Sequence, residues 1–385
     1  MSEKKRKPSI RFKGFQDEWK EEQIKDVLSY ERPDKYIVKS DKYLSAGVPV
    51  LTANKSFVLG YTNETNTYKK ALPVIIFDDF TLDNKLVDFP FMVKSSAIKI
   101  LTPKNFSDIY FDYNLIRTTP FIMEGHARHY ISIVQKKKVN IPKVFEQQKI
   151  GTFFAKLDQL LDLQQQKLDQ LELLKKVLLQ KLFPKQGTKI PELRFKGFED
   201  EWKQDTISNI AVVTTGNTPS TNKKQYYSTK GIPWVTPSNI NKEGKIFDEK
   251  HLSEQGVKVA RIVPKGSVLV TSIASIGKNT LVKTSTAFNQ QINAITPKES
   301  FDSYFIYISS IGISKKMKTI ASTGTMQIIN KREFSEMEIQ FPSISEQQKI
   351  GNLFAKVDRL IELENKKFSN LKLVKKSLLQ NMFVK

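Results

Sequence analysis

The amino-acid sequence contains two copies of one pattern, and this duplication constrains the fold more than any other feature. The segment PSIRFKGFQDEWK at 8–20 returns as PELRFKGFEDEWK at 191–203, and EQQKIGTFFAKLDQLLDL at 146–163 returns as EQQKIGNLFAKVDRLIEL at 346–363. Between these anchors weaker matches keep their order while their spacing widens, as expected when one fold accepts small insertions in its loops. We therefore predict that the 385 residues form two homologous halves.

Each half begins with a segment of mixed secondary structure and ends with one long helix. Short β-rich runs such as PVIIF at 73–77 alternate with amphipathic stretches and with the Gly, Pro, Asn and Ser clusters typical of turns. Matching helices are expected at 108–116 and 303–311. The predicted boundaries are 1–145 and 184–345 for the two mixed α/β domains, and 146–183 and 346–385 for the two long helices.

Apolar residues recur at heptad spacing in both long helices, a pattern typical of coiled coils. At ~1.5 Å per residue each helix would be about 57 Å long, too long to bury its apolar stripe against its own domain. We therefore expect the stripes to pack against each other, although packing of each stripe on its own domain stays open. The positions expected to pack are Ile150, Leu157, Leu171, Leu178, Ile350, Val357, Leu371 and Leu378.

An antiparallel helix pair is favoured, because a parallel pair would force the chain to return along most of the first helix before the second begins. Gln164 and Glu364 interrupt the heptad rows at equivalent positions, and an antiparallel pair would bring them face to face at the crossing, where they would set the register. The sequence thus predicts an α+β fold in which two mixed α/β domains are separated by an antiparallel pair of long coiled-coil helices, with a pseudo-two-fold internal repeat.

The composition excludes several classes of protein. Without cysteine the chain has no disulfide scaffold, Cys-ligated zinc, iron-sulfur cluster or Cys nucleophile, which is typical of the reducing cytosol. The longest apolar run, in ALPVIIF at 71–77, is far shorter than the ~20 residues of a membrane helix, so we expect a soluble, cytoplasmic chain. A net charge of +22 favours a polyanionic partner, although ribosomal and membrane-surface proteins share this property.

The two anchors together resemble the DNA-specificity subunit of Type I restriction-modification enzymes. RFKGFxxEW opens each half, a variable domain follows, and EQQKI opens each long helix, so the resemblance covers essentially the full chain. The second domain adds TTGNTPS at 214–220, GIPWVTPSNI at 231–240 and ASTGTMQIIN at 321–330, which are similar to recognition domains of this family. The first domain instead has FDDFTLDNK at 77–85 and GHARHY at 125–130, which resemble a second subtype.

This resemblance implies a function for each part of the chain. Each variable domain would read one half of a bipartite, asymmetric site in double-stranded DNA, while the helix pair would set the half-site spacing and dock two modification (methyltransferase) subunits. Restriction/motor subunits would complete a restriction endonuclease and adenine-DNA methyltransferase. The chain itself would be non-catalytic and bind no cofactor, whereas the complex would use S-adenosylmethionine, ATP and Mg²⁺.

Base readout needs side chains that donate or accept hydrogen bonds at groove edges, and phosphate contacts can also use hydroxyl groups. For each polar loop residue, however, stabilisation of a turn is an equal alternative. Trp19 and Trp202 lie in the repeated openings and are interpreted as structural anchors. The candidate DNA-binding residues are Asn54, Lys55, Thr81, Lys85, Arg117, His126, Arg128, His129 and Tyr130 in the first domain, and Thr218, Ser220, Tyr227, Thr236, Asn239, Lys278, Asn289, Gln290, Thr323, Thr325 and Gln327 in the second.

Signals for enzymatic chemistry are weak, and no metal site is expected. His126 and His129 have no third His nearby and no Cys, and Asp78 with 83–85 only loosely resembles the acid pair and lysine of a metal-dependent nuclease. The sequence has no Asn-Pro-Pro or Asp-Pro-Pro methyltransferase motif, and the segment before Lys278 fails as a phosphate-binding loop. A nuclease built from duplicated domains and a coiled-coil adaptor stay open as alternative functions.

Overall fold

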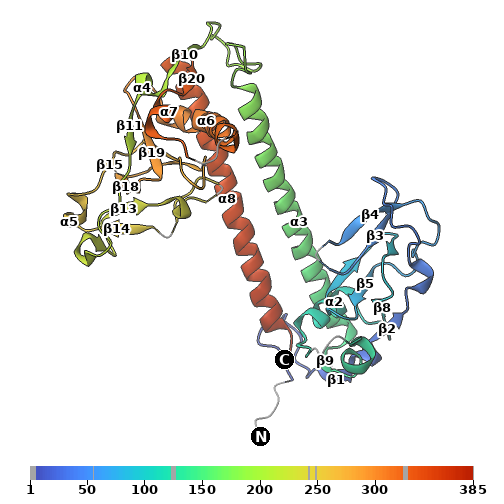
Figure 1. The fold of residues 1–385 in the computed structure, drawn as a ribbon. Coiled ribbons are helices and arrows are strands. Elements are labelled where there is room, and N and C mark those ends of the chain that lie inside the picture. The colour runs from blue at the N-terminus through green and yellow to red at the C-terminus, as the bar shows by residue number, and fades with distance from the viewer. Residues whose placement is uncertain are drawn as a thin grey trace. The chain divides into compact units, whose positions relative to one another are not determined.

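The computed structural model describes residues 6–54, 56–122, 127–241, 243–247, 249–323 and 328–384. It divides into two compact units: unit 1 is Met1–Gln166 with Asn365–Lys385, and unit 2 is Lys167–Glu364. Each long helix, α3 (Val144–Lys181) and α8 (Ile344–Met382), runs through both units (Figure 1). The compact units therefore differ from the four predicted sequence segments, because each unit combines one domain with part of both long helices.

Unit 1 contains a four-stranded antiparallel sheet, a three-stranded sheet and a two-stranded ribbon. Their strand orders are β2-β8-β5-β6, β4-β3-β7 and β1-β9. The strands are β1 (Lys20–Gln23), β2 (Leu28–Glu31), β3 (Val48–Leu51), β4 (Val58–Thr62), β5 (Val74–Asp78), β6 (Asn84–Val87), β7 (Met92–Val93), β8 (Ile98–Pro103) and β9 (Lys138–Ile141). The shorter helices are α1 (Ile24–Val27), η1 (Asp34–Tyr36), α2 (Ile109–Thr118) and η2 (Tyr130–Val134).

Unit 2 repeats this arrangement with a larger second sheet. The strand orders are β11-β19-β16-β17, β12-β14-β13-β18-β15 and β10-β20. The strands are β10 (Lys203–Thr206), β11 (Ala211–Thr215), β12 (Tyr227–Ser228), β13 (Ile232–Val235), β14 (Lys250–Leu252), β15 (Ile262–Val263), β16 (Val268–Thr271), β17 (Asn279–Leu281), β18 (Thr286–Phe288), β19 (Ile292–Pro297) and β20 (Glu338–Phe341). The shorter helices are α4 (Ile207–Ile210), η3 (Lys224–Tyr226), η4 (Pro237–Asn239), α5 (Glu254–Val257), α6 (Ser303–Thr323) and α7 (Lys331–Ser335).

The α+β class and the internal duplication are confirmed by these matching sheets. The expected helices at 108–116 and 303–311 are α2 and the first part of α6, and the long helices begin two residues before the predicted 146 and 346. None of the helices in the described ranges is long and apolar enough to cross a membrane.

A buried ion pair joins the two anchor motifs in each unit. Arg11 of the first RFKGF segment donates two hydrogen bonds of 2.7 Å to Glu146 of EQQKI, and Arg194 donates two of 2.9 and 2.8 Å to Glu346. Both carboxylates are only 1% exposed. Such bidentate pairs are strong and directional, and loss of one partner would leave a buried charge. The motifs therefore recur because they fasten each domain to the start of its helix.

The glycine after EQQKI allows a short helix to approach the long one. A Cβ atom at Gly151 would lie 1.9 Å from Oδ1 of Asp108, and a Cβ at Gly351 would lie 2.3 Å from Oδ1 of Asp302. Each of these carboxylates accepts a 2.8 Å hydrogen bond from a backbone N–H in the first turn of α2 or α6. No side chain fits there without displacing a helix cap.

We expect Gly351→Ala to destabilise unit 2 by about 1–3 kcal/mol, the usual cost of overpacking a core. The matched control is Gly312→Ala in α6, where an added Cβ meets nothing within 4 Å. Because alanine is the better helix former, the control should stabilise the helix by about 0.5–1 kcal/mol. Chemical denaturation of the full chain measures both changes, and equal effects of the two substitutions would contradict the packing argument.

In unit 1 the two long helices pack antiparallel. The ring centroids of Phe154 and Phe383 lie 6.0 Å apart, and Asp158 forms an ion pair with Lys375. As the position rises along α3, its partner falls along α8, which requires opposite directions. Phe383 also packs against Trp19 and Phe111 in the core of the first domain.

Unit 2 shows the same antiparallel packing with the helices exchanged. Phe183 lies 6.2 Å from Phe354 between ring centroids, and Lys175 lies 2.6 Å from Asp358. Trp202 is 1% exposed and contacts Phe183, as Trp19 contacts Phe383 in unit 1, so the two tryptophans are structural anchors as predicted. The alternative in which each stripe packs only on its own domain is wrong.

The predicted packing positions lie on these inner faces. Ile150, Ile350 and Val357 are buried, and the five leucines at 157, 171, 178, 371 and 378 are half-buried. Gln164 and Glu364 are 4% and 9% exposed, and Glu364 forms an ion pair with Lys167. That Gln164 and Glu364 face each other stays a prediction.

Candidate nucleic-acid interface

Two parallel strands end at one edge of the second sheet of unit 2. In β13 and β18, Trp234 pairs with Ala287 and Val235 with Phe288. The next residues, Thr236 and Asn289, therefore leave the sheet side by side, and the backbone N–H of Asn289 still donates to Val235 O at 3.0 Å. Because all edge residues here are loop residues held by strands, this edge positions polar side chains precisely enough for recognition.

The first cluster at this edge is built around the turn after β13. Thr236 Oγ1 donates to Asn239 Oδ1 at 2.7 Å, and Asn239 Nδ2 donates to Phe247 O at 3.2 Å. Lys278 Nζ reaches the same turn and donates to Pro237 O at 2.9 Å. The three predicted residues Thr236, Asn239 and Lys278 are thus brought together, half-buried, in a hydrogen-bonded group.

The second cluster is carried by the TTGNTPS loop. A Cβ at Gly216 would lie 2.2 Å from Phe288 O, so only glycine lets this loop lie against the end of β18. Thr218 Oγ1 donates to Gln290 Oε1 at 2.6 Å, and both side chains are exposed. Tyr227 OH donates to Pro219 O at 2.7 Å and so holds the loop from below.

The remaining candidates of the second domain divide by exposure. Ser220 is exposed, whereas Asn289 is only 7% exposed and uses its amide on Gln291 in a tight turn. Burial contradicts a direct DNA contact for Asn289 and assigns it to the turn. The side chain of Thr323, and Thr325 and Gln327, lie outside the described residues.

A cationic groove of about 760 Å³ adjoins the first cluster. Lys278 lines it together with Lys315 and Lys318 from α6 and with Lys175 from α3. The sequence analysis missed Lys315 and Lys318, although their spacing of three residues places both on one helix face. Positive charge beside a polar strand edge suits a phosphate backbone, which supplies much of the affinity for DNA.

Unit 1 presents the equivalent edge with different side chains. In the parallel strands β3 and β7, Val50 pairs with Met92 and Leu51 with Val93. Beyond β3, Thr81 Oγ1 donates to Asn54 Oδ1 at 3.2 Å, which brings two predicted residues together. Lys94, which follows β7 and forms an ion pair with Asp41, was missed by the sequence analysis. Lys55 lies outside the described residues.

The FDDF segment builds a turn. Asp78 Oδ1 accepts backbone N–H groups of Phe80 and Thr81, each at 2.9 Å, and Asp79 forms a buried ion pair of 2.8 Å with Lys99. These carboxylates are occupied by the fold, which accounts for them without a nuclease. Within the residues that the structure describes, no group of three or more His, Cys, Asp or Glu side chains could hold a metal ion.

The GHARHY segment corrects two predicted contacts. His129 and Tyr130 are 1% and 0% exposed, so burial contradicts the prediction that they touch DNA. Their backbone N–H groups donate to Asp79, at 2.9 Å to its carbonyl and 2.7 Å to its carboxylate, and burial raises the pKa of the Tyr130 hydroxyl. Arg128 is exposed, with its guanidinium 5.9 Å from the ring centroid of Phe80. His126 lies outside the described residues.

The last two candidates lie on secondary structure. Lys85 is half-buried on β6, opposite Ile76. Arg117 is exposed near the end of α2, 5.1 Å from the ring centroid of Tyr113. It lines a separate groove with the end of α8, to which Asn54 and Thr81 do not contribute. The structure therefore does not place Arg117 in the strand-edge cluster.

Comparisons with known proteins agree with this architecture. The family model described as Type I restriction modification DNA specificity domain matches residues 16–173 and 199–373. The chain is 33% identical over 366 residues to the Type I restriction enzyme EcoR124I/EcoR124II specificity subunit of Escherichia coli, covering 90% of this chain and 88% of that protein. It is 33% identical over 191 residues to the MjaIX specificity subunit of Methanocaldococcus jannaschii, covering 48% and 44% of the two chains. The crystal structure of a Type-I restriction-modification system S subunit from M. genitalium has the same fold, with a TM-score of 0.73 at 14% identity over 98% of this chain and 99% of that one.

Proposed function

This chain belongs to the family of Type I restriction-modification DNA-specificity proteins, and from this premise we propose how it reads DNA and with whom it works. It recognises a double-stranded DNA sequence as a non-catalytic specificity subunit. The observation that carries this function is the repeated strand edge, where equivalent scaffolds present unlike side chains. Unit 2 offers Thr218, Gln290 and the Lys278 group, whereas unit 1 offers Asn54 and Thr81.

Unlike readers on one duplicated scaffold fit a bipartite, asymmetric site. Each edge is built by its own unit, so each domain reads one half-site independently of the other. The long helices belong to both units and set the spacing between the half-sites. Direct contacts come from exposed donors and acceptors such as Gln290 and Arg128, and lysines beside the edges position the duplex through its phosphates.

The partners follow from the same family. Two modification (methyltransferase) subunits dock on the helix pair, and restriction/motor subunits complete the complex in the cytoplasm. The S-adenosylmethionine, ATP and Mg²⁺ that the chemistry needs are held by those subunits, and this chain binds no cofactor of its own. Its contribution to catalysis is the choice of DNA sequence.

Selection of random duplexes by the purified full chain tests this function. We expect enrichment of one bipartite site, and affinity that falls about 10³- to 10⁵-fold between 50 and 200 mM salt, as for six to ten phosphate contacts. Exchange of the first domain for that of a relative should change one half-site and leave the other unchanged. Salt-independent affinity would favour the adaptor alternative, and robust DNA cleavage by this chain with Mg²⁺ would favour a nuclease.

Lengthening both helices tests their function as a ruler. One heptad inserted after Gln166 and another after Glu364, at the unit boundaries, should add ~10 Å and widen the half-site spacing by about three base pairs. The half-sites themselves should stay unchanged. The control inserts five residues at both places, which turns the helix faces by about 140° and should abolish recognition of any bipartite site. Unchanged spacing in the heptad variant would exclude the ruler.

A further inference from the structure

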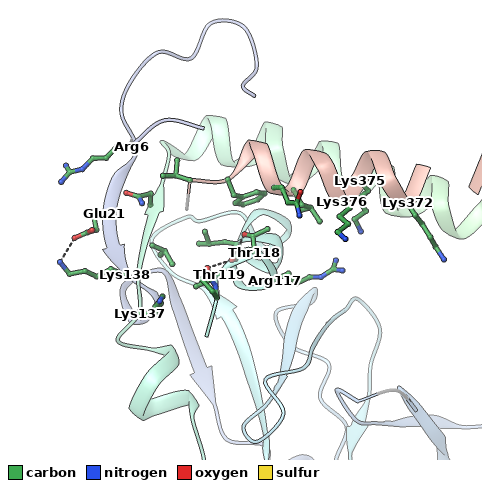
Figure 2. Close-up of a pocket in the computed structure, with 18 of the residues that line it drawn as sticks. Arg6, Glu21, Arg117, Thr118, Thr119, Lys137, Lys138, Lys372, Lys375 and Lys376 are labelled. Carbon is green, nitrogen blue, oxygen red and sulfur yellow. Dashed lines mark hydrogen bonds and ion pairs between the residues drawn. The ribbon is translucent and has the colours of Figure 1, made fainter. Parts of the chain in front are cut away.

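Unit 1 contains a cationic groove that the reading of target DNA does not use. Its volume is about 770 Å³, and it lies between the end of α2, β9 and the last turns of α8. Figure 2 shows Arg117, Lys372, Lys375 and Lys376 at one end of the groove and Arg6, Lys137 and Lys138 at the other, where Glu21 is the only carboxylate drawn. The groove therefore has concentrated positive charge at both ends.

The middle of the groove is less polar. Leu115 and Val139 line it from α2 and β9, and Leu161 and Leu379 line it from the two long helices. Thr118 and Thr119 lie between the cationic ends in Figure 2, but their hydroxyls donate to backbone carbonyls of α2. An occupant thus meets cations at each end and mainly apolar atoms between them.

Most of this charge is not neutralised by the protein. Among the lining cations, Lys138 pairs with Glu21 at 2.7 Å, and Lys375 pairs with Asp158. In the described part of the chain, the other five form no ion pair with a carboxylate: Arg6, Arg117, Lys137, Lys372 and Lys376. Holding so many like charges around one groove is unfavourable unless an anion binds there.

The equivalent groove of unit 2 shows that the fold does not require these cations. That groove, of about 860 Å³, lies between α6, β20 and the end of α3. The matching of helix caps at Asp108 and Asp302, and of the EQQKI segments, aligns the two grooves residue by residue. At four equivalent positions unit 2 has Ile311, Met337, Glu338 and Glu172 in place of Arg117, Lys137, Lys138 and Lys372.

We propose that the groove of unit 1 binds single-stranded nucleic acid. Phosphates of neighbouring nucleotides would contact the two cationic ends, and the sugar and base between them would cover the apolar floor. Sites for single strands combine such cations with apolar or aromatic surfaces, and the volume is that of a small-ligand pocket, which a duplex cannot enter. A free nucleotide would engage only one end and should bind more weakly.

Fluorescence anisotropy of labelled (dT)₆ with the full chain at 150 mM salt tests this proposal. The variant Arg117→Ile, Lys137→Met, Lys138→Glu and Lys372→Glu installs the residues of unit 2, which this fold already accommodates. We expect saturable binding to the unmodified chain and at least about tenfold weaker binding to the variant. The slope of log affinity against log salt should become shallower by about 3, because four phosphate contacts are lost at ~0.7 each.

The control variant Lys35→Glu, Lys69→Glu and Lys265→Glu lowers the net charge by the same amount at exposed lysines outside both grooves. It should keep (dT)₆ affinity within about twofold, and equal loss in both variants would overturn the proposal in favour of general attraction. Competition by inorganic triphosphate as strong as by unlabelled (dT)₆ would also overturn it, since the apolar floor would then recognise nothing.

Two further measurements separate this site from target recognition. Affinity for the target duplex should stay within about threefold in the groove variant, and its loss in parallel with (dT)₆ binding would place the duplex in the groove and overturn the assignment. Should the fourfold variant fold poorly, Lys372→Glu alone, on an exposed helix position, should still weaken (dT)₆ binding about threefold. No change in that single variant would contradict the proposed contact.

Discussion

Substitution of Phe383 by alanine is expected to destabilise the first domain by about 3–5 kcal/mol, although this residue lies near the end of the chain. Its ring stacks on Phe111 at 5.3 Å between centroids and also contacts Phe154 and Trp19. The side chain is 4% exposed within the main core of unit 1. Removing it leaves a cavity among aromatic rings that cannot easily collapse.

Hydrogen exchange resolved by peptide measures this effect separately in the two units. Protection should fall in β1, α2 and the first turns of α3, and stay unchanged in α6 and β16–β19. The reciprocal variant Phe183→Ala should reverse this pattern, because Phe183 packs between Trp202, Phe305 and Phe354 in unit 2. Leu373→Ala on the same stretch of α8, where the side chain is 65% exposed, should cost less than about 0.5 kcal/mol. Loss of protection mainly in unit 2 after Phe383→Ala would refute the assignment.

The duplication and the antiparallel helices could be predicted because they are written in repeated motifs and heptad spacing. The exchange of helix ends could not, since a heptad pattern shows that two helices pair but not which core receives their last residues. Phe183 and Phe383 follow the heptad rows and carry no polar neighbour that would mark them as core residues of the distant domain. Lys175 and Lys375 were also missed, because a lysine within an apolar row looks exposed until Asp358 and Asp158 are placed beside it.

The candidate DNA contacts were predicted less well, for a physical reason. Polar residue types indicated the loops at the strand edge, and Thr218 with Gln290 are brought together there. His129 and Tyr130 belong instead to a buried turn, because their backbone groups are held by Asp79. One sequence shows which side chains can donate a hydrogen bond, but only the fold shows which are already used.

A chain shortened to residues 1–187 is expected to form a homodimer. In unit 1 the N-terminal part of α3 is covered by the last turns of α8, which the shortened chain lacks. The end of its own α3 carries a nearly equivalent surface, and a second copy can supply it. Lys175, Leu178, Leu179, Leu182 and Phe183 would take the places of Lys375, Leu378, Leu379, Met382 and Phe383.

Each copy would thus complete the other, as the two halves complete each other in the full chain. Phe183 of one copy would fill the pocket beside Trp19 and Phe111, and Lys175 would pair with Asp158 of its partner. A symmetric interface of this kind buries the same surface twice, so it closes as a dimer. A monomer would expose the apolar face of Phe154, Leu157 and Leu161 and should not persist.

Sedimentation velocity at micromolar concentration measures the assembly, and duplex selection should yield a palindrome made of two copies of the first half-site. Lys175→Glu places like charges together at two symmetric contacts and should weaken the dimer by about tenfold or more, since a repelling pair is only partly screened there. Lys176→Glu makes the same charge change at an exposed neighbouring position and should leave the dimer intact. A stable folded monomer would show that the first domain needs no second helix, and it would remove the reason for the exchanged ends.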